Sequence, residues 1–211
     1  MTTRVMLQNL ATEICIQQDK FTNSWHSDPE DCLTDGSTLM VRVVEQHRFN
    51  FDLWHEEDKA REPGADNATI AGVKGRIDRL NQQRNDMVTV IDEYLDDCYF
   101  GPLDNSLDNK NELPWNSETI GSIVDRLSIA SLKNYHMHEQ TERQDADAAH
   151  IASCALKFER LVEQQNDLAT ALQCFIDDIF NGKKQNKLYR QFKMYNDPAL
   201  NPKIYGQTEP S

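Results

Sequence analysis

The sequence lacks the features that mark a membrane or secreted protein. No stretch approaches the roughly 18 consecutive apolar residues that suggest a membrane-spanning helix. The first residues, MTTRVMLQNLATEICIQQ, interrupt any apolar core with Gln and Glu, so we expect no export signal. The five cysteines are odd in number and form no CxxC pair, which favours free thiols in a reducing compartment. We therefore expect a cytoplasmic protein with no membrane partner.

Positive charge is also scarce. The 22 Lys and Arg residues face 35 Asp and Glu residues, and the net charge is −13. This balance argues against nucleic acid and anionic lipid as partners. The charge is uneven, because residues 183–205 carry +5 and the rest of the chain carries −18. We expect this basic tail to lie as a strap across an acidic surface.

Strand-like alternation of apolar and polar residues is absent, whereas apolar residues recur at three- and four-residue spacing along the chain. We predict a single all-α domain over residues 1–211. Asp66 is expected to cap the third helix, and Asn116 or Ser117 the fourth. Residues 31–38 and 101–116 have loop composition. The predicted helices span 3–20, 37–62, 66–99, 117–143, 147–181 and 184–195.

An internal repeat organises the middle of the chain. At an offset of 81 residues, 51–101 and 132–182 share 15 identities in 51 positions. The offset places Trp54-His55 over Tyr135-His136. We predict duplicated helical hairpins at about 37–101 and 118–182, forming an antiparallel four-helix bundle with an extra N-terminal helix and a C-terminal strap outside it.

Polar side chains interrupt the apolar stripes of these helices at two levels. At 100° per residue, Asp58 projects from the stripe of its helix, and Arg84 lies in the stripe of the next. Counting from the hairpin turns places Arg84 level with Asp125, and His47, Asn81, Ser128 and Gln165 lie near that layer. A second layer, nearer the turns, holds His55, Asp58, Arg61, His136, Glu139 and, as a further candidate, His150.

Three interpretations of the second layer remain open. His-x-x-Asp (His55, Asp58) and His-x-x-Glu (His136, Glu139) on two related helices are candidate ligands of a divalent metal. A salt-bridge network pairing Asp58 with Arg61 and Glu139 with a histidine explains the same residues. The third interpretation is a ligand pocket, to which Trp54 and Tyr135 would contribute. The preferred interpretation is that the protein binds no cofactor, and the alternative is a divalent metal.

The Arg84–Asp125 layer has two interpretations as well. A buried ion pair between repeats would fix the register of the helices. Alternatively, Arg84 would bind an anionic group in a cavity. In either case a buried guanidinium requires a carboxylate, so we predict direct contact between Arg84 and Asp125.

Carboxylates crowd the ends of two predicted helices, where the helix dipole disfavours them. Pairing with the basic tail would offset this cost. A magnesium site, of the kind found in all-α nucleotide pyrophosphohydrolases, is the alternative. The residues are Asp92, Glu93, Asp96, Asp97, Asp177 and Asp178.

Several segments between about residues 50 and 202 resemble a bacterial family catalogued as domain of unknown function 4254. They are WHEED with Arg61, RIDRLNQQRNDMV, IDEYL, SIVDRLSIASLKNYHMHEQ, DLATAL and FKMYNDPALNP. The resemblance implies no activity, and residues 1–45 match none of its pattern. It implies signature positions at Trp54, His55, Glu57, Asp58, Arg61, Arg84, Asp86, Asp125, Arg126, Tyr135, His136 and Asn196-Asp197-Pro198.

The sequence therefore predicts a small-ligand or protein-binding module with a polar site inside a helical bundle. Its expected ligand-binding residues are Trp54, His55, Asp58, Arg61, Arg84, Asp125, Tyr135, His136 and Glu139. The alternative is a metal-dependent hydrolase or other enzyme that uses the His/Asp/Glu layer. The partner is an unidentified small molecule or protein, and a homodimer is an open alternative.

Overall fold

The computed structural model describes residues 7–33, 36–64, 66–104, 112–189, 199, 200 and 202. Every regular element within these ranges is helical, which confirms the predicted all-α class. In the same ranges no helix has both the length and the apolarity needed to cross a membrane. The elements are α2 (Leu10–Trp25), α3 (Thr38–Lys59), α4 (Asn67–Leu95), the π-helical turn η1 (Asp96–Phe100), α5 (Gly101–Asp104), α6 (Ile120–Thr141) and α7 (Ala148–Phe180).

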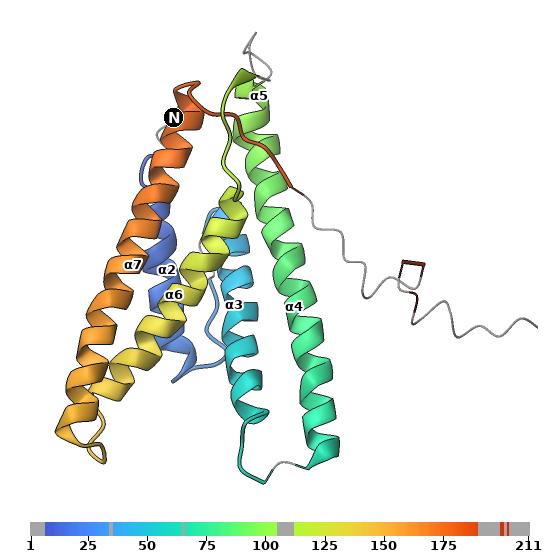
Figure 1. The fold of residues 1–211 in the computed structure, drawn as a ribbon. Coiled ribbons are helices and arrows are strands. Elements are labelled where there is room, and N and C mark those ends of the chain that lie inside the picture. The colour runs from blue at the N-terminus through green and yellow to red at the C-terminus, as the bar shows by residue number, and fades with distance from the viewer. Residues whose placement is uncertain are drawn as a thin grey trace, which may run out of the picture.

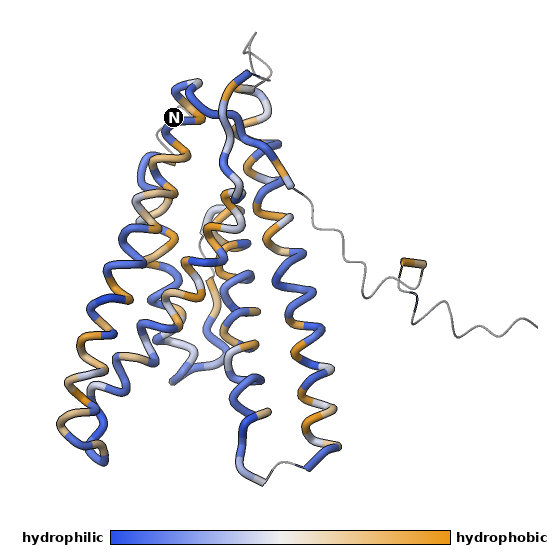
Figure 2. The backbone as a smooth tube through the Cα atoms, viewed as in Figure 1, coloured by the Kyte–Doolittle hydropathy of each residue, from blue (hydrophilic) through white to orange (hydrophobic). Residues whose placement is uncertain are grey.

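The long helices form two antiparallel hairpins. Helix α3 packs along α4, helix α6 packs along α7, and both turns lie at the same end of the molecule (Figure 1). Helix α6 also contacts α4, α3 and α2, so it joins the two hairpins. Apolar and polar residues alternate along each helix at short intervals (Figure 2), as expected for amphipathic helices with one buried face.

Side chains cap the starts of α3, α4, α6 and α7. Asp66 accepts a hydrogen bond from the Thr69 amide at 2.8 Å, as predicted. Asp147 caps α7 in the same way, 81 residues later. The predicted caps of the fourth helix are wrong, because α6 begins later and Thr119 accepts from the Ser122 amide at 3.2 Å.

Other helix ends also differ from prediction. Helix α2 extends to Trp25 rather than ending near residue 20. Helix α4 continues through η1 into α5, so the predicted loop at 101–116 begins as helix. Residues 184–189 are not helical, because Gln185 bonds to the carbonyls of Leu113 and Pro114 instead. The remainder of the helix predicted at 184–195 lies outside the described residues.

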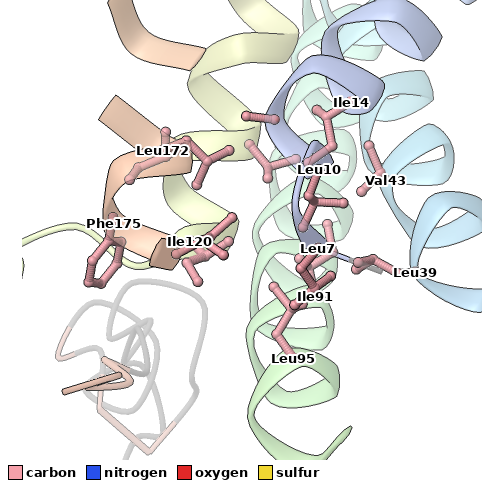
Figure 3. Packing of buried hydrophobic residues seen from close by; sticks show 14 of the residues in the cluster. Leu7, Leu10, Ile14, Leu39, Val43, Ile91, Leu95, Ile120, Leu172 and Phe175 are labelled. Carbon is pink, nitrogen blue, oxygen red and sulfur yellow. The ribbon is translucent and has the colours of Figure 1, made fainter. Parts of the chain in front are cut away.

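Two clusters of buried apolar residues form the core. The larger one draws on all five long helices, and Figure 3 shows its packing around Leu10, Ile91 and Leu172. The smaller one consists of Phe21, Trp25, Val44, Phe51 and Leu132. Helix α2 contributes to both clusters and contacts α3, α6 and α7. The N-terminal helix is therefore part of the core, not an addition to its outside as predicted.

Helices α4 and α6 pack tightly against each other at Gly121. A Cβ atom there would lie 2.5 Å from the Val88 carbonyl oxygen, so only glycine fits. The Gly121 amide donates to Asp92 Oδ1 at 2.6 Å. Burial raises the pKa of Asp92 to about 6, although hydrogen bonds from Thr119 and Gly121 lower it. This contact holds α4 against α6 where the two hairpins meet.

Candidate metal centre

The predicted contact between Arg84 and Asp125 is present and joins α4 to α6. Arg84 Nε donates to Asp125 Oδ1 at 2.7 Å, and its Nη2 bonds Oδ2 in a second parallel contact. Asp125 is buried, and its side chain also accepts from Gln46 Nε2 at 2.5 Å and Asn50 Nδ2 at 2.9 Å. Because the guanidinium and the carboxylate satisfy each other, this pair is a structural link between the hairpins.

His47 extends this layer across to α2. Its Nδ1 lies 2.7 Å from Ser128 Oγ, and its Nε2 lies 2.9 Å from Thr22 Oγ1. Burial lowers the pKa of His47 to about 3, so the ring is neutral at physiological pH. Gln165 was expected near this layer but lies outside it, because its side chain bonds Asn134 and Asp19.

The second layer contains a cluster of three histidines from three helices. His26 follows the last residue of α2, His55 lies on α3, and His136 lies on α6. One ring nitrogen from each lies within 4.8 Å of those of the other two, and all three rings are half-buried. Three imidazoles converging from separate elements form a common ligand set for transition metals.

The hydrogen bonds of the cluster leave the same nitrogen free on each ring. His26 Nδ1 lies 2.6 Å from the Thr22 carbonyl oxygen, and His55 Nδ1 lies 2.8 Å from the Phe51 carbonyl oxygen. His136 Nδ1 lies 2.9 Å from Glu139 Oε2. Carbonyl and carboxylate oxygens only accept, so each Nδ1 carries the proton and each Nε2 presents a lone pair.

Two of these lone pairs accept no hydrogen bond from the described residues. The Nε2 atoms of His26 and His136 are buried and, among the described residues, have no hydrogen-bond partner. An unsatisfied buried polar atom carries a desolvation cost that a bound ligand would remove. Burial lowers the pKa of His26, the Thr22 carbonyl raises it, and the neighbouring His136 and His55 lower it further. The lowered pKa keeps His26 neutral, as metal binding requires.

Aromatic rings hold the histidines in place. Tyr135 stacks on His26 at 3.9 Å between ring centroids, and Trp54 stacks on His136 at 4.7 Å with an interplanar angle of 7°. Phe51 lies against His26 and His55 at 5.0 and 4.3 Å. This packing restricts the rotation of each ring and excludes water from its faces.

The structure separates the residues predicted for the second layer. His55 and His136 meet, and Glu139 pairs with a histidine as predicted. The prediction that Asp58 projects into the core is wrong: Asp58 is exposed. Arg61 is also exposed and pairs with Glu57 at 2.9 Å, not with Asp58. His150 lies elsewhere, with its Nε2 3.5 Å from Cys154 Sγ.

Asp58 and Arg61 border a separate groove of about 330 Å³. Trp54 and Arg84 line it with them, beside the apolar side chains of Leu53, Ile129 and Leu132. Both arginines are already bonded to carboxylates. The described residues that line the groove therefore offer apolar surface but no free cation, which argues against Arg84 as the binding group for an anion.

His26 was absent from the sequence-based candidates. It lies outside the repeat and outside the segments that carry the family resemblance, and the helix before it was predicted to end too early. The sequence nevertheless contains a pattern that could have identified His26. Of the six histidines, only three follow an aromatic residue, in Trp25-His26, Trp54-His55 and Tyr135-His136, and these three form the cluster.

The acidic helix ends match the pairing interpretation where the tail is described. Lys183 and Lys184 place their Nζ atoms 3.9 and 3.4 Å from Asp178 carboxylate oxygens. Asn186 donates to Asp96 Oδ1 at 3.0 Å. Among the described residues, the histidine cluster is the one group of three potential ligands within metal-binding distance, so no three of these acids converge in that way.

Comparison with curated proteins and with solved structures finds no match. A family model, "Protein of unknown function (DUF4254)", matches residues 41–188. The matched range contains His55 and His136, whereas His26 precedes it. Because the match covers well over half of the sequence, the chain belongs to the DUF4254 family.

Proposed function

We propose that this protein binds a divalent transition-metal ion through the Nε2 atoms of His26, His55 and His136. Two observations together carry the proposal. One ring nitrogen of each histidine lies within 4.8 Å of those of the other two, and all three Nδ1 atoms bond to oxygen acceptors. Oxygen acceptors of this kind orient metal-binding histidines and raise their basicity. The metal site predicted as an alternative from the sequence consisted of His55, Asp58, His136 and Glu139. The geometry supports a different set, in which His26 joins His55 and His136.

The spacing of the cluster suits a small ion. Zinc–nitrogen bonds of about 2.0–2.1 Å separate tetrahedral ligands by roughly 3.3 Å. The separation of up to 4.8 Å in the structure exceeds this by about 1.5 Å, so the rings would close inward on binding. Imidazole donors suit zinc, copper, iron and nickel better than magnesium or calcium.

Three protein ligands leave a tetrahedral site with one open position. Catalytic zinc sites have this arrangement, and the ion lowers the pKa of a water bound at the open position to about 7. Glu139 would hold the His136 ring and increase its basicity through the Nδ1 bond. The function that this site supports best is metal-dependent hydrolysis of a small substrate.

Metal titration tests the proposal directly. Untagged, chelator-treated protein is titrated with Zn²⁺ by calorimetry, and with Co²⁺ while its visible absorption is recorded. We expect one ion per chain. We also expect His26→Ala, His55→Ala and His136→Ala each to weaken binding by at least about 100-fold, since each removes one of three ligands.

His138→Ala is the matched control. His138 lies two residues from His136 on α6 but is exposed and faces Glu142 at 3.7 Å. Its removal should leave the stoichiometry and affinity unchanged. Wild-type protein that binds no ion, or a His138 variant that weakens as much as the cluster variants, would contradict the proposed site.

A further inference from the structure

A groove of about 320 Å³ opens beside the histidine cluster, and His55 belongs to both. The groove lies between α3 and α4, with Lys59, Arg76, Arg79 and Gln83 among its lining residues. Its volume is at the lower end of the range for small-molecule sites. A molecule in this groove would therefore reach the ion at His55.

Positive charge exceeds negative charge along this groove. Glu56 accepts from Lys59 Nζ at 2.7 Å and from Arg76 Nε at 2.6 Å, so two cations share one carboxylate. The other lining acid, Asp52, is paired with Arg48 at 2.9 Å. The groove is thus basic within a chain whose net charge is −13.

Hydrogen-bond donors remain available there. Within the described part of the chain, the Arg79 side chain makes no hydrogen bond or ion pair, and the Arg76 side chain uses only its Nε. The terminal nitrogens of Arg76 and the whole guanidinium of Arg79 can therefore bind an additional acceptor. Planar guanidinium groups bind phosphate and carboxylate oxygens with two parallel hydrogen bonds.

The other side of the cluster has the opposite charge. A groove of about 660 Å³ beside Tyr135 is lined by Asp19, Glu139 and Glu142, with His138 as its one imidazole. Like charge there would repel an anion. An anionic substrate would therefore approach the cluster from the His55 side.

We propose that the groove between α3 and α4 binds the phosphate group of a small phosphate ester, with Arg76 and Arg79 as its recognition residues. This inference rests on the proposed metal site, which would meet the same phosphate next to His55. A dianionic phosphate matches two arginines and a divalent ion better than a monoanionic carboxylate does. Hydrolysis of such an ester joins a water oxygen to phosphorus and breaks the ester P–O bond, and the departing oxygen takes a proton from that water. An ion held by His26, His55 and His136 would supply the activation of this water.

Calorimetry with phenylphosphonate, which cannot be hydrolysed as an ester, tests the groove in Zn²⁺-loaded protein. We expect Arg79→Gln to weaken phenylphosphonate binding by about 10- to 100-fold, the worth of a charge-assisted hydrogen bond. The same variant should bind Zn²⁺ as the wild type does. Arg160→Gln, an exposed arginine on α7, is the matched control and should change neither affinity.

The two proposals can fail separately. Unchanged phenylphosphonate binding in Arg79→Gln, or equal binding of benzoate, would overturn the phosphate site while leaving the metal titration intact. A wild-type protein that binds no Zn²⁺ would overturn the metal proposal. Phenylphosphonate titrated into that metal-free protein then decides the groove: binding that Arg79→Gln weakens supports it, and absence of binding overturns it.

Discussion

Two polar clusters lie inside the same bundle and differ in how completely they are bonded. In the first, Arg84, Asp125 and His47 meet protein partners, and both nitrogens of His47 are engaged. In the second, the hydrogen bonds within the described ranges engage only Nδ1 of each histidine, and two Nε2 atoms are buried without partners there. Gln46 Oε1 is the exception in the first layer, since it is buried without a partner among the described residues. A bonded ion pair and a bonded ring stabilise and align helices, whereas converging ring nitrogens without partners indicate a ligand. The same residue type is structural in one layer and a candidate ligand in the other.

The largest expected effect tests the bonded layer. Asp125→Ala should lower the free energy of unfolding by about 3–5 kcal/mol, because it leaves Arg84 without its carboxylate inside the bundle. Arg84→Met should cost less, since that side chain is partly exposed. The double variant Arg84→Met/Asp125→Leu should recover only part of the stability that Asp125→Ala loses, because Gln46 and Asn50 also donate to Asp125. Urea unfolding measures all three; a double variant as stable as wild type would show that those two bonds contribute little.

Metal should distinguish the two clusters. Zn²⁺ at 100 times its dissociation constant should raise the free energy of unfolding by about 2.7 kcal/mol, because it binds the folded state. Asp125→Ala should keep this gain, whereas His55→Ala should lose it. Thermal unfolding with and without Zn²⁺ provides the measurement, and a gain that survives His55→Ala would place the ion elsewhere.

The acceptor behind His136 should matter to metal affinity. Glu139→Gln should weaken Zn²⁺ binding by about 10- to 100-fold, because a neutral amide supports the ring less well than a carboxylate. Stability without metal should change little, since Glu139 is exposed. Calorimetry on this variant beside Glu142→Gln, a neighbouring exposed acid, separates the specific bond from general charge. Equal affinities in the two variants would argue against the role of Glu139.

Lowering the pH should decrease the free energy of unfolding, because His47 is buried in its neutral form. The pKa of His47 is lowered to about 3, so protonation of the unfolded state removes stability as pH falls from the ordinary value of 6.5. From pH 7 to 5 this loss is about 2 kcal/mol. The pKa of Asp92 is raised to about 6, so this carboxyl takes up a proton in the folded state over the same interval. The penalty for burying its charge therefore decreases, and the free energy of unfolding rises by about 1 kcal/mol.

The two titrations therefore oppose each other, and one substitution separates them. Asp92→Asn retains an acceptor for the Gly121 amide but removes the titrating carboxyl. We expect this variant to lose about 1 kcal/mol more than wild type between pH 7 and 5. Urea unfolding at both pH values checks this, and parallel losses in the two proteins would contradict the raised pKa of Asp92.

The smallest effect belongs to exposed pairs. Replacing Lys183 and Lys184 together by Gln removes two ion pairs to Asp178 and should cost less than about 1 kcal/mol. The stability of this variant should depend less on salt than that of wild type, because surface charges are screened. Unfolding at low and high ionic strength measures the difference. A loss as large as that of Asp125→Ala would contradict the contrast between surface and buried pairs.

The duplication of the hairpins remains a prediction. Helices α4 and α7 both begin after an Asp cap at the 81-residue offset, and His55 and His136 lie in one cluster at that offset. Superposing 37–99 on 118–180 should place Trp54 and Tyr135 in equivalent positions. Each ring already stacks on a histidine of the cluster, but on different ones. Trp54 and Tyr135 in unrelated positions would argue against a duplication.

The sequence by itself determined the helical class, most helix positions and the contact between Arg84 and Asp125. These follow from apolar periodicity, and from the rule that a buried guanidinium requires a carboxylate at its own level. The helices needed only local chemistry, because each depended on the pattern of a single segment. The contact between Arg84 and Asp125 joins different hairpins, and it was predicted by counting the level of each residue from the hairpin turns.

Only the tertiary structure decided which polar residues share a site. Helix α2 enters the core and brings His26 to His55 and His136, which lie far away in sequence. Asp58 lies in the last turn of α3 and Arg61 follows the end of that helix, and both side chains are exposed. Periodicity identifies the apolar face of a helix, but the rotation of each helix and its neighbours follow from packing across the whole core.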